Sequence, residues 1–485
     1  MDQMTYMQNA EAFLAELELE YYRVGAGLQP VLELASIYAK HADLFGEEAT
    51  RTRLAERGTV ETRYLASFTV DGFLENQVTA LTEEIANAEL AATVPWDGAE
   101  VPYQQVPILL MNEDDRPRRG ELARRYYARQ AELNPKRTRR WNQLHTLTRS
   151  LGFADYVAAV DDLRALDLRR LAEQMAWVLD VTEAPFEREL STRLSSRGVP
   201  RDEAAIWDVS PMFRAREFDP LFPAERMLPA LRQTLAGLGI DLDAQPNVHL
   251  DTEARPPKSP RAFCSAIHIP QDVRLVIQPA GGMNDYGSLF HEAGHAEHFA
   301  HIDTGLEFAY RRLGDTSVTE TYAFLLEHLL FSPAWLEGIL GLRSGQYQEA
   351  MHASRFNLLW AVRRYAAKLN YELELHAGLV DAKASAYAFW LHRGCRVRIP
   401  PQRFLDDVDD GFYVAQYLRA WIFEAQLRRH LEKTFGAEWF ARRPAGDLLK
   451  GLWRVGQQIP VEELARQIGA PGLDLAPLVA QLTTL

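Results

Sequence analysis

The sequence predicts a mainly α-helical protein with one small β-sheet, and three observations support this fold class. Apolar side chains recur at helical spacing along most of the chain, as Phe13, Leu17 and Tyr21 do near its start. Only two short runs, residues 263–269 and 273–278, have the valine and isoleucine content of strands, and a Pro-Gln-Asp turn separates them. The sequence also lacks an internal repeat and any low-complexity tract.

The N-terminal part, residues 8–94, is predicted to be helical. Gly25 and Pro30 mark the break between its first two helices. Residues 60–90 form one long helix or two, and their apolar positions drift around the helix axis, which indicates packing on several sides. The following segment, residues 94–107, contains several prolines and an Asp-Gly pair, so we expect a loop there.

An arginine-rich segment follows at residues 116–141. A site for a polyanion is one interpretation, but acidic residues flank and interleave the basic ones, so a solvated helical face is the simpler one. Residues 153–195 resume an amphipathic helical pattern, and the proline-containing residues 200–223 are expected to be irregular.

The composition is that of an ordinary soluble globular protein, with 47% apolar and 25% charged residues among 485. A net charge of -14 argues against nucleic acid or an anionic membrane as the main partner. Two cysteines, Cys264 and Cys395, are too few for a disulfide framework, so reduced thiols and a cytoplasmic location are predicted. Residues 1–18 lack the layout of a signal peptide, and no apolar run is long enough to span a membrane.

The most informative stretch is His291-Glu292-Ala293-Gly294-His295, which has the form His-Glu-x-x-His. Residues four apart lie on one face of a helix, so both imidazoles can reach one metal ion. Glu292 is adjacent to the first histidine and can act as a general base on a water molecule. A chance match remains the alternative, because so short a pattern also occurs on helices without metal.

A catalytic zinc takes three protein ligands, and Glu320 is the best candidate for the third. It opens the strongly helical residues 319–331 after a Gly-Asp-Thr-Ser turn, far enough along the chain for a second helix to return beside the motif. His298 lies two turns beyond His291, so we expect it to support a ligand or to pack as a polar core residue. Glu327 is predicted to orient a ligand or to face solvent. The other acidic and histidine candidates are His301, Asp303 and Glu307.

The run from His291 to His298, followed by Glu320, resembles the zinc metallopeptidase family of thimet oligopeptidase and oligoendopeptidase F, which are gluzincins. The resemblance implies that His291, His295 and Glu320 hold one Zn²⁺ and that Glu292 is the general base. It covers roughly residues 200–480 and implies a nearly all-α ellipsoid split by a deep substrate channel. We therefore expect residues 1–205 to form a helical N-terminal lobe and residues 206–485 the catalytic region, the two acting as one catalytic unit.

Further similarity lies at Lys258–Ser265, at Phe412–Tyr417 and at Leu448–Gly469. The second segment implies that Tyr413 or Tyr417 donates a hydrogen bond to the oxyanion of the reaction, although tyrosines at these positions also suit packing.

Two positions depart from the family pattern. The histidine that the family commonly has shortly before these tyrosines is replaced near Val408. Ala420 stands where some members have a further tyrosine. The loss of one oxyanion donor costs about 10² to 10³ in rate, so these changes bear directly on activity.

These observations predict a zinc-dependent metalloendopeptidase that hydrolyses internal bonds of short unfolded peptides. Two alternatives stay open: a zinc-binding homologue that binds peptides with weak or no activity, and a carboxypeptidase or dipeptidase with the same fold. Short peptides are the expected partners, and the sequence does not indicate an oligomeric state.

Overall fold

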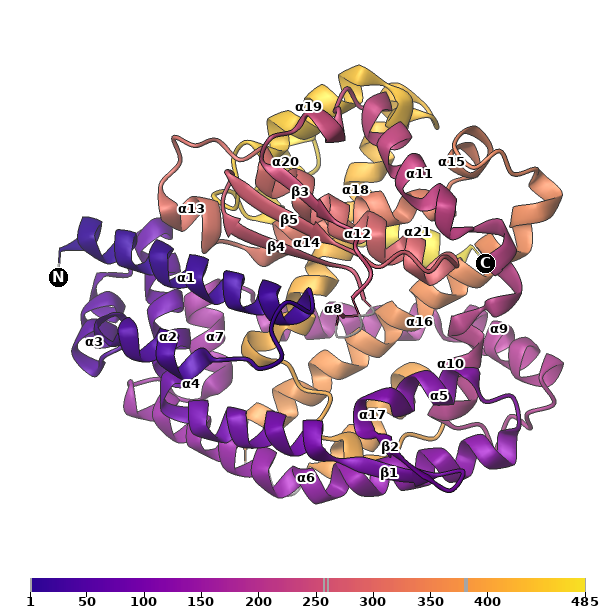
Figure 1. The fold of residues 1–485 in the computed structure, drawn as a ribbon, viewed down its shortest axis with the longest axis horizontal. Coiled ribbons are helices and arrows are strands. Elements are labelled where there is room, and N and C mark those ends of the chain that lie inside the picture. Colours follow the sequence, from indigo (N-terminus) through magenta and orange to yellow (C-terminus); the bar gives the residue numbers. More distant parts are fainter. Residues whose placement is uncertain (1, 256–257, 260, 379–382, 485) are drawn as a thin grey trace. The chain divides into compact units, whose positions relative to one another are not determined.

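A computed structural model describes residues 2–255, 258–259, 261–378 and 383–484. The described chain is mainly helical, which confirms the predicted fold class, and its strands form two small sheets (Figure 1). The sequence predicted a single sheet, and the second sheet, a two-stranded hairpin, contradicts that prediction. Within the described ranges, no helix combines the length and the apolarity needed to cross a membrane.

The chain folds into two compact units, each assembled from separated segments. Unit 1 contains the residues up to Phe73, Arg216–His352 and Arg419–Leu478. Unit 2 contains Leu74–Ala215, Ala353–Leu418 and the residues from Val479 onward. Both units thus draw on each side of residue 205, and the expected division of the chain into lobes 1–205 and 206–485 stays a prediction.

The helices of unit 1 include one at the N-terminus and a group around the zinc motif. They are α1 Gln3–Gly25, α2 Leu34–Lys40, α3 Glu47–Glu56, α11 Ala224–Gly237, α12 Met283–Ala300, α13 Phe308–Arg312, α14 Thr316–Glu327, α15 Pro333–Gly338, α19 Arg443–Trp453 and α20 Val461–Gln467. Those of unit 2 are α5 Val106–Asn112, α6 Arg116–Ser150, α7 Tyr156–Arg164, α8 Leu168–Val181, α9 Glu183–Ser196, α10 Ile206–Arg214 and α17 Ala384–Cys395. Four helices contribute residues to both units: α4 Val60–Ala91, α16 Ser344–His376, α18 Tyr413–Phe435 and α21 Ala476–Thr483.

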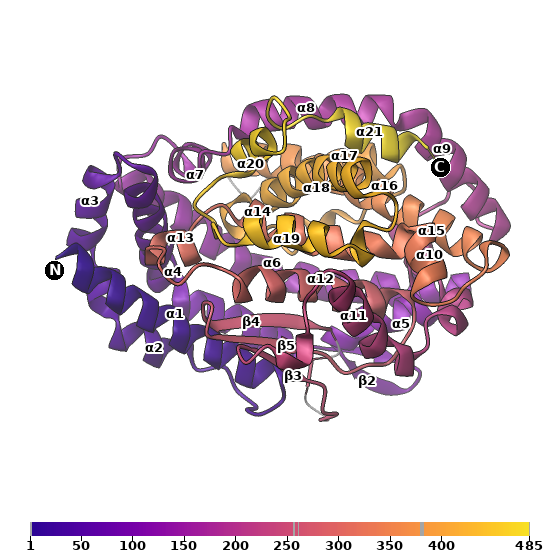
Figure 2. The same ribbon diagram turned by 90° about the horizontal axis from the view of Figure 1, so that it is seen from above.

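The sheet of unit 1 supports α12, the helix that carries the His-Glu-x-x-His motif. Its strands have the order β3-β5-β4, with bounds β3 Val248–Asp251, β4 Phe263–His268 and β5 Asp272–Val276. The pairing of β4 with β5 is antiparallel, as expected for a hairpin, whereas β3 runs parallel to β5. Helix α12 lies between this sheet and α14 (Figure 2). The two predicted strands are confirmed, and β3 escaped prediction because four residues carry little periodicity.

The second sheet contradicts the loop predicted at residues 94–107. Strands β1 Thr93–Trp96 and β2 Ala99–Pro102 form an antiparallel hairpin in unit 2. Its turn residues Asp97 and Gly98 both have positive φ, 50° and 78°. A two-residue Asp-Gly turn of this kind matches the twist of the flanking strands. The prolines are tolerated because both strands of a two-stranded sheet are edge strands.

Other elements of the chain also differ from or refine the predictions. Residues 60–90 belong to the single long helix α4. The arginines of residues 116–141 are paired with acidic side chains, for example Arg118 with Asp97 at 2.7 Å, so they do not form an open site for a polyanion. Part of the segment predicted to be irregular is helical as α10, whose Pro211 had argued against a helix.

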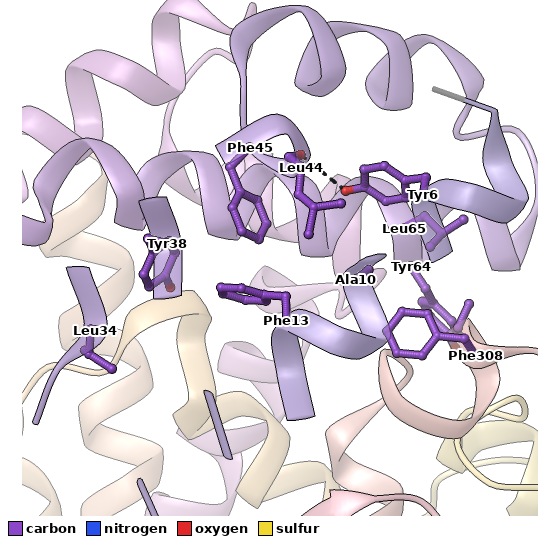
Figure 3. Packing of buried hydrophobic residues seen from close by; sticks show 11 residues of the cluster. Tyr6, Ala10, Phe13, Leu34, Tyr38, Leu44, Phe45, Tyr64, Leu65 and Phe308 are labelled. Carbon is purple, nitrogen blue, oxygen red and sulfur yellow. Dashed lines mark hydrogen bonds between the residues drawn. The ribbon is translucent and has the colours of Figure 1, made fainter. Parts of the chain in front are cut away.

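The N-terminal helix of unit 1 is held by a buried aromatic cluster (Figure 3). The Phe13 ring makes edge contacts with Tyr38 and Phe45, at centroid distances of 5.1 and 4.8 Å. Phe308 of α13 belongs to the same cluster. This packing places α1 alongside β4, the strand next to the motif helix.

Candidate metal centre

The turn before α12 sets the start of the motif helix. Gly281 and Gly282 have φ values of 84° and 89°, a region that favours glycine. A side chain at Gly281 would meet the backbone nitrogen of Ala224 at 2.8 Å. The Asp285 carboxylate accepts hydrogen bonds from the backbone N–H groups of Ala280 and Gly281, at 2.7 and 2.9 Å. The residues before the motif are thus tied to the first turn of the helix.

Gly294, the third residue after His291, allows α12 and α14 to approach closely. A Cβ atom at this position would lie 2.5 Å from both the Cα atom of Ala323 and the carbonyl oxygen of Tyr322 on α14. Both atoms belong to the backbone and cannot rotate away. The glycine therefore permits the short distance between the helices that brings the motif histidines to Glu320.

Replacing Gly294 by alanine is expected to lower the free energy of unfolding by about 1–3 kcal/mol, as overpacking does in other cores. The added methyl group should also push α12 and α14 apart and so weaken the binding of zinc. Urea denaturation and zinc titration of the variant measure the two effects. Gly287→Ala on the same helix is the control, since a Cβ there meets its nearest atom, Leu330 Cδ1, at 3.7 Å. A Gly294→Ala protein as stable as the Gly287→Ala protein would contradict the role of close packing.

The structure brings together the three residues predicted to hold the metal. The Nε2 atoms of His291 and His295 lie 3.4 and 3.6 Å from the same oxygen, Oε2 of Glu320. One donor atom of each residue lies within 4.8 Å of the other two. Glu320 is almost fully buried, at 2% exposed. Burial of a carboxylate is costly unless a positive group compensates it.

The outer nitrogens of both histidines are engaged, which turns their inner nitrogens toward Glu320. The Nδ1 atom of His291 is 3.0 Å from Oε2 of Glu327, and Nδ1 of His295 is 2.8 Å from the Thr319 hydroxyl. Such partners fix the ring orientation and tautomer of metal-binding histidines. Glu327 therefore lies where a ligand-orienting residue was predicted. Sequence reasoning missed Thr319, although its position directly before Glu320 on α14 was a usable signal.

The donor set, and the distances from Glu320 to the two imidazoles, fit a tetrahedral zinc ion. Two imidazole nitrogens and one carboxylate oxygen are the ligands of one class of catalytic zinc site. Bonds of 2.0–2.1 Å in a tetrahedron place neighbouring ligand atoms about 3.4 Å apart. The distances from Glu320 Oε2 to the two imidazoles, 3.4 and 3.6 Å, lie close to this value.

The charges at this site favour a cation. Burial lowers the pKa of His291, but the hydrogen bonds and charges of Glu320 and Glu327 outweigh it and raise that pKa well above 6.5. Burial lowers the pKa of His295 to about 4, so this imidazole is neutral near pH 7. A neutral imidazole is the form that binds a metal. The carboxylates of Glu320 and Glu327 thus attract positive charge. The neutral His295 imidazole has a lone pair available to bind a metal ion.

Glu292, the predicted general base, is held by the neighbouring sheet. Its Oε2 atom accepts a hydrogen bond from the backbone N–H of Cys264 in β4, at 2.9 Å. Burial raises the pKa of Glu292 to about 7, with a further rise from Glu320 and an opposing effect of His291. A base with a pKa close to the working pH exchanges protons most effectively. The contribution of Cys264 is a backbone group, which no residue pattern could have revealed.

His298 occupies a buried position away from the ligand atoms. Its ring lies 5.3 Å from that of Phe299 and 5.0 Å from that of Tyr322. Burial lowers its pKa to about 3, so the ring is neutral. The contacts are those of a packed polar residue, and its predicted support of a ligand stays a prediction.

The two tyrosines predicted to bind the oxyanion lie at the start of α18, in unit 2. The rings of Tyr413 and Tyr417 are 5.1 Å apart, and Tyr365 of α16 lies 5.4 Å from Tyr417. All three rings are partly buried. Their assignment as oxyanion donors stays a prediction.

The structure gives a packing reason for one departure from the family pattern. Ala420 is fully buried in unit 1. Its carbonyl oxygen lies 3.5 Å from the hydroxyl of Thr321 on α14. Because Ala420 has no exposed surface, a side chain as large as tyrosine at this position would have to displace its neighbours.

Comparisons with known proteins identify the fold. No protein-family model and no curated protein sequence matches the chain. Among solved structures, PZ peptidase A in complex with an inhibitor aligns with a TM-score of 0.63 and 15% identity, over 99% of this chain and 86% of that one.

Two structures described as oligoendopeptidase F also align. The one from Bacillus anthracis strain Ames has a TM-score of 0.59 and 16% identity, over 96% of this chain and 83% of the other. The second has a TM-score of 0.62 and 14% identity, over 96% and 86%. This chain therefore has the fold of these peptidase structures.

Proposed function

We propose that this protein is a zinc-dependent peptidase that cleaves internal bonds of short peptides. The observation that carries the proposal is the convergence of His291, His295 and Glu320, whose donor atoms lie within 4.8 Å of one another, with Glu292 next to His291 in the motif. A purely structural zinc site has a closed ligand set and needs no adjacent base. The shared fold with oligoendopeptidase F and PZ peptidase structures supports the same conclusion.

The two histidines and Glu320 would hold the zinc ion. When bound, zinc supplies a Lewis acid that polarises a carbonyl and acidifies water. Glu327 and Thr319 keep the histidine rings turned so that Nε2 faces inward. Their hydrogen bonds fix the geometry before substrate arrives, which reduces the reorganisation required during reaction.

Glu292 would move the proton. Its carboxylate takes a proton from the attacking water and then gives it to the nitrogen of the leaving amine. The pKa of about 7 suits both steps, because the group accepts and releases a proton at similar cost near neutral pH. The N–H of Cys264 holds one oxygen, and the other would be left to exchange the proton.

Tyr413 or Tyr417 would stabilise the oxyanion of the tetrahedral intermediate. A phenol O–H donates a hydrogen bond to the oxygen as negative charge develops on it. With Val408 in place of the family histidine, these tyrosines would carry the task without that residue. We extend the proposal to a deep channel that admits short unfolded peptides and to a cytoplasmic location. The free thiols of Cys264 and Cys395 agree with the latter.

Chelation tests the metal dependence of the proposed activity. A mixed library of short peptides is incubated with the full chain, and the products are identified by mass spectrometry. Cleavage should disappear after treatment with a chelator and return when zinc is restored in a stoichiometry of one ion per chain. Cleavage that persists in metal-free protein would refute a zinc peptidase.

The same library separates the two alternative activities. Capped and uncapped versions of one peptide distinguish internal cleavage from removal of terminal residues. A non-catalytic homologue, which Val408 and Ala420 favour, would bind zinc and peptides without releasing products. The intact Glu292, partly buried and hydrogen-bonded next to His291, favours the enzyme.

A further inference from the structure

A polar stripe on α16 runs through the interior of unit 2. It consists of Tyr365, Lys368, Glu372 and His376, which we call the α16 stripe. Spacings of three and four residues put them on one face of the helix. Lys368, Glu372 and His376 are buried. Buried titratable side chains are costly, so their partners show what the stripe holds in place.

The middle of the stripe holds Asp409, which follows Val408. The Lys368 ammonium donates to Oδ2 of Asp409 at 2.5 Å. The Glu372 carboxylate accepts the backbone N–H of the same residue at 3.2 Å. Lys368 also lies 3.8 Å from Asp407, on the other side of Val408. Two adjacent turns of α16 therefore grip the backbone and the side chain of this segment.

The end of the stripe holds the turn that precedes Tyr413. Gly411 and Phe412 have φ values of 63° and 53°. The left-handed region is uncommon for a bulky residue such as phenylalanine and persists only where surrounding contacts impose it. The His376 ring lies 5.1 Å from Phe412, and Tyr156 accepts the Gly411 N–H at 2.9 Å.

His376 is itself locked in place. Its Nδ1 atom lies 2.9 Å from Nε2 of His145, a buried residue of α6. The rings of Trp141 and Tyr156 lie 4.6 and 4.8 Å from it. Neighbouring helices thus fix the side chain that supports Phe412.

The start of the stripe reaches the tyrosines directly. The ring of Tyr365 lies 5.4 Å from that of Tyr417, which lies 5.1 Å from that of Tyr413. The Lys368 ammonium is 5.6 Å from the Tyr365 ring, within the range of a cation–π contact. One face of α16 therefore contacts both the segment before Tyr413 and the ring of Tyr417.

We infer that the α16 stripe is the positioning element for the oxyanion-binding tyrosines, with Lys368 as its central positioning residue. The inference rests on the proposed peptidase function. Lys368 holds the segment around Val408, where the family histidine is absent, and so fixes the backbone from which Tyr413 and Tyr417 project. A donor held in place before the reaction stabilises the transition state more than one that must be ordered during it.

Lys368→Met in the full, zinc-loaded chain tests the inference. The variant should lower kcat by about 10- to 100-fold with little change in KM, because a misplaced oxyanion donor affects the transition state alone. Hydrogen exchange of the backbone amides from residue 409 to residue 414 should accelerate. Zinc content should stay at the wild-type level, since the candidate ligands belong to unit 1.

A double variant separates positioning from stability. Lys368→Met removes the ammonium group that lies 2.5 Å from Asp409 and 3.6 Å from the fully buried Glu372 carboxylate, and the uncompensated buried charge destabilises the fold. Adding Glu372→Gln removes that buried charge and should restore stability without restoring the bond from Lys368 to Asp409. The double variant is thus expected to regain its melting temperature while kcat stays low. Recovery of kcat together with stability would reduce Lys368 to a structural role and overturn the inference.

Glu183→Gln is the matched control. It removes the carboxylate that lies 2.6 Å from the buried Arg363 guanidinium in the same unit. We expect unchanged kcat at a comparable loss of stability. A folded Lys368→Met protein with wild-type kcat and wild-type amide exchange also overturns the inference. If the wild-type chain shows no chelator-sensitive cleavage, the proposed function fails, while amide exchange still reports whether Lys368 holds the turn.

Discussion

Replacing Glu292 by glutamine is expected to lower kcat by about 10² to 10⁴, the range that general acid–base catalysis contributes. Glutamine keeps the size of the side chain and can still accept the Cys264 N–H, but it cannot take a proton from water. Zinc should stay bound, because the three candidate ligands are unchanged. The measurement is the rate of cleavage of a quenched oligopeptide, with the zinc content of each preparation determined by mass spectrometry.

Glu297→Gln on the same helix provides a demanding control. Burial raises the pKa of Glu297 to about 7, as it does for Glu292, but Glu297 accepts a hydrogen bond from Gln245 at 3.0 Å. Both substitutions remove a hydrogen-bonded carboxylate from α12, and because Glu297 is fully buried whereas Glu292 is partly buried, the control should lose at least as much stability. Only the change at Glu292 should lower kcat by this amount. Full turnover by zinc-loaded Glu292→Gln protein would refute the general-base role.

Removal of the Glu320 carboxylate is expected to abolish both zinc binding and peptidase activity. In Glu320→Ala the two imidazoles remain, but the charged donor that faces both Nε2 atoms is lost. A site with two neutral ligands holds a divalent cation far less tightly than one completed by a carboxylate. Zinc affinity is measured by competition with a chromophoric chelator, alongside the unfolding transition of the metal-free protein.

Glu327→Gln is expected to have a zinc affinity between those of the wild-type protein and Glu320→Ala. The residue contacts Nδ1 of His291 from outside the candidate ligand set, and loss of such an orienting carboxylate costs about 10- to 100-fold in metal affinity or activity. Affinity should therefore fall in the order wild type, Glu327→Gln, Glu320→Ala. Equal affinity of Glu320→Ala and wild-type protein would exclude Glu320 as a ligand and remove the basis for the hydrolase.

Local sequence patterns were enough for the parts of the structure that form within one element. Helical periodicity predicted the mainly α fold, and a spacing of four placed His291 and His295 on one face of α12. The Asp-Gly pair at residues 97 and 98 carried a hairpin signal that the neighbouring prolines obscured. Strand β3 has too few residues to show a period, and its pairing with β5 depends on a chain segment some twenty residues away.

The α16 stripe likewise separates what a local sequence pattern can predict from what it cannot. Tyr365, Lys368, Glu372 and His376 are visibly spaced along one helical face in the sequence. The residues that contact them are distant in the sequence. Lys368 binds Asp409, which comes later in the chain, and His376 contacts His145, which comes much earlier. A helix pattern identifies which side chains share a face, but it cannot identify what that face will meet.

The sequence by itself identified the two candidate histidine ligands and the candidate base, because hydrogen bonds between near neighbours set the geometry of a helix, and it placed the candidate third ligand, Glu320, at the start of a second helix. Only the tertiary structure decided that Glu320 faces both Nε2 atoms, that Glu327 and Thr319 turn the rings, and that the Cys264 backbone holds Glu292. Those relations depend on how closely α14 and β4 pack against α12. Packing of this kind reflects the shapes of many distant side chains and one missing Cβ, at Gly294, and these act together only in the folded chain.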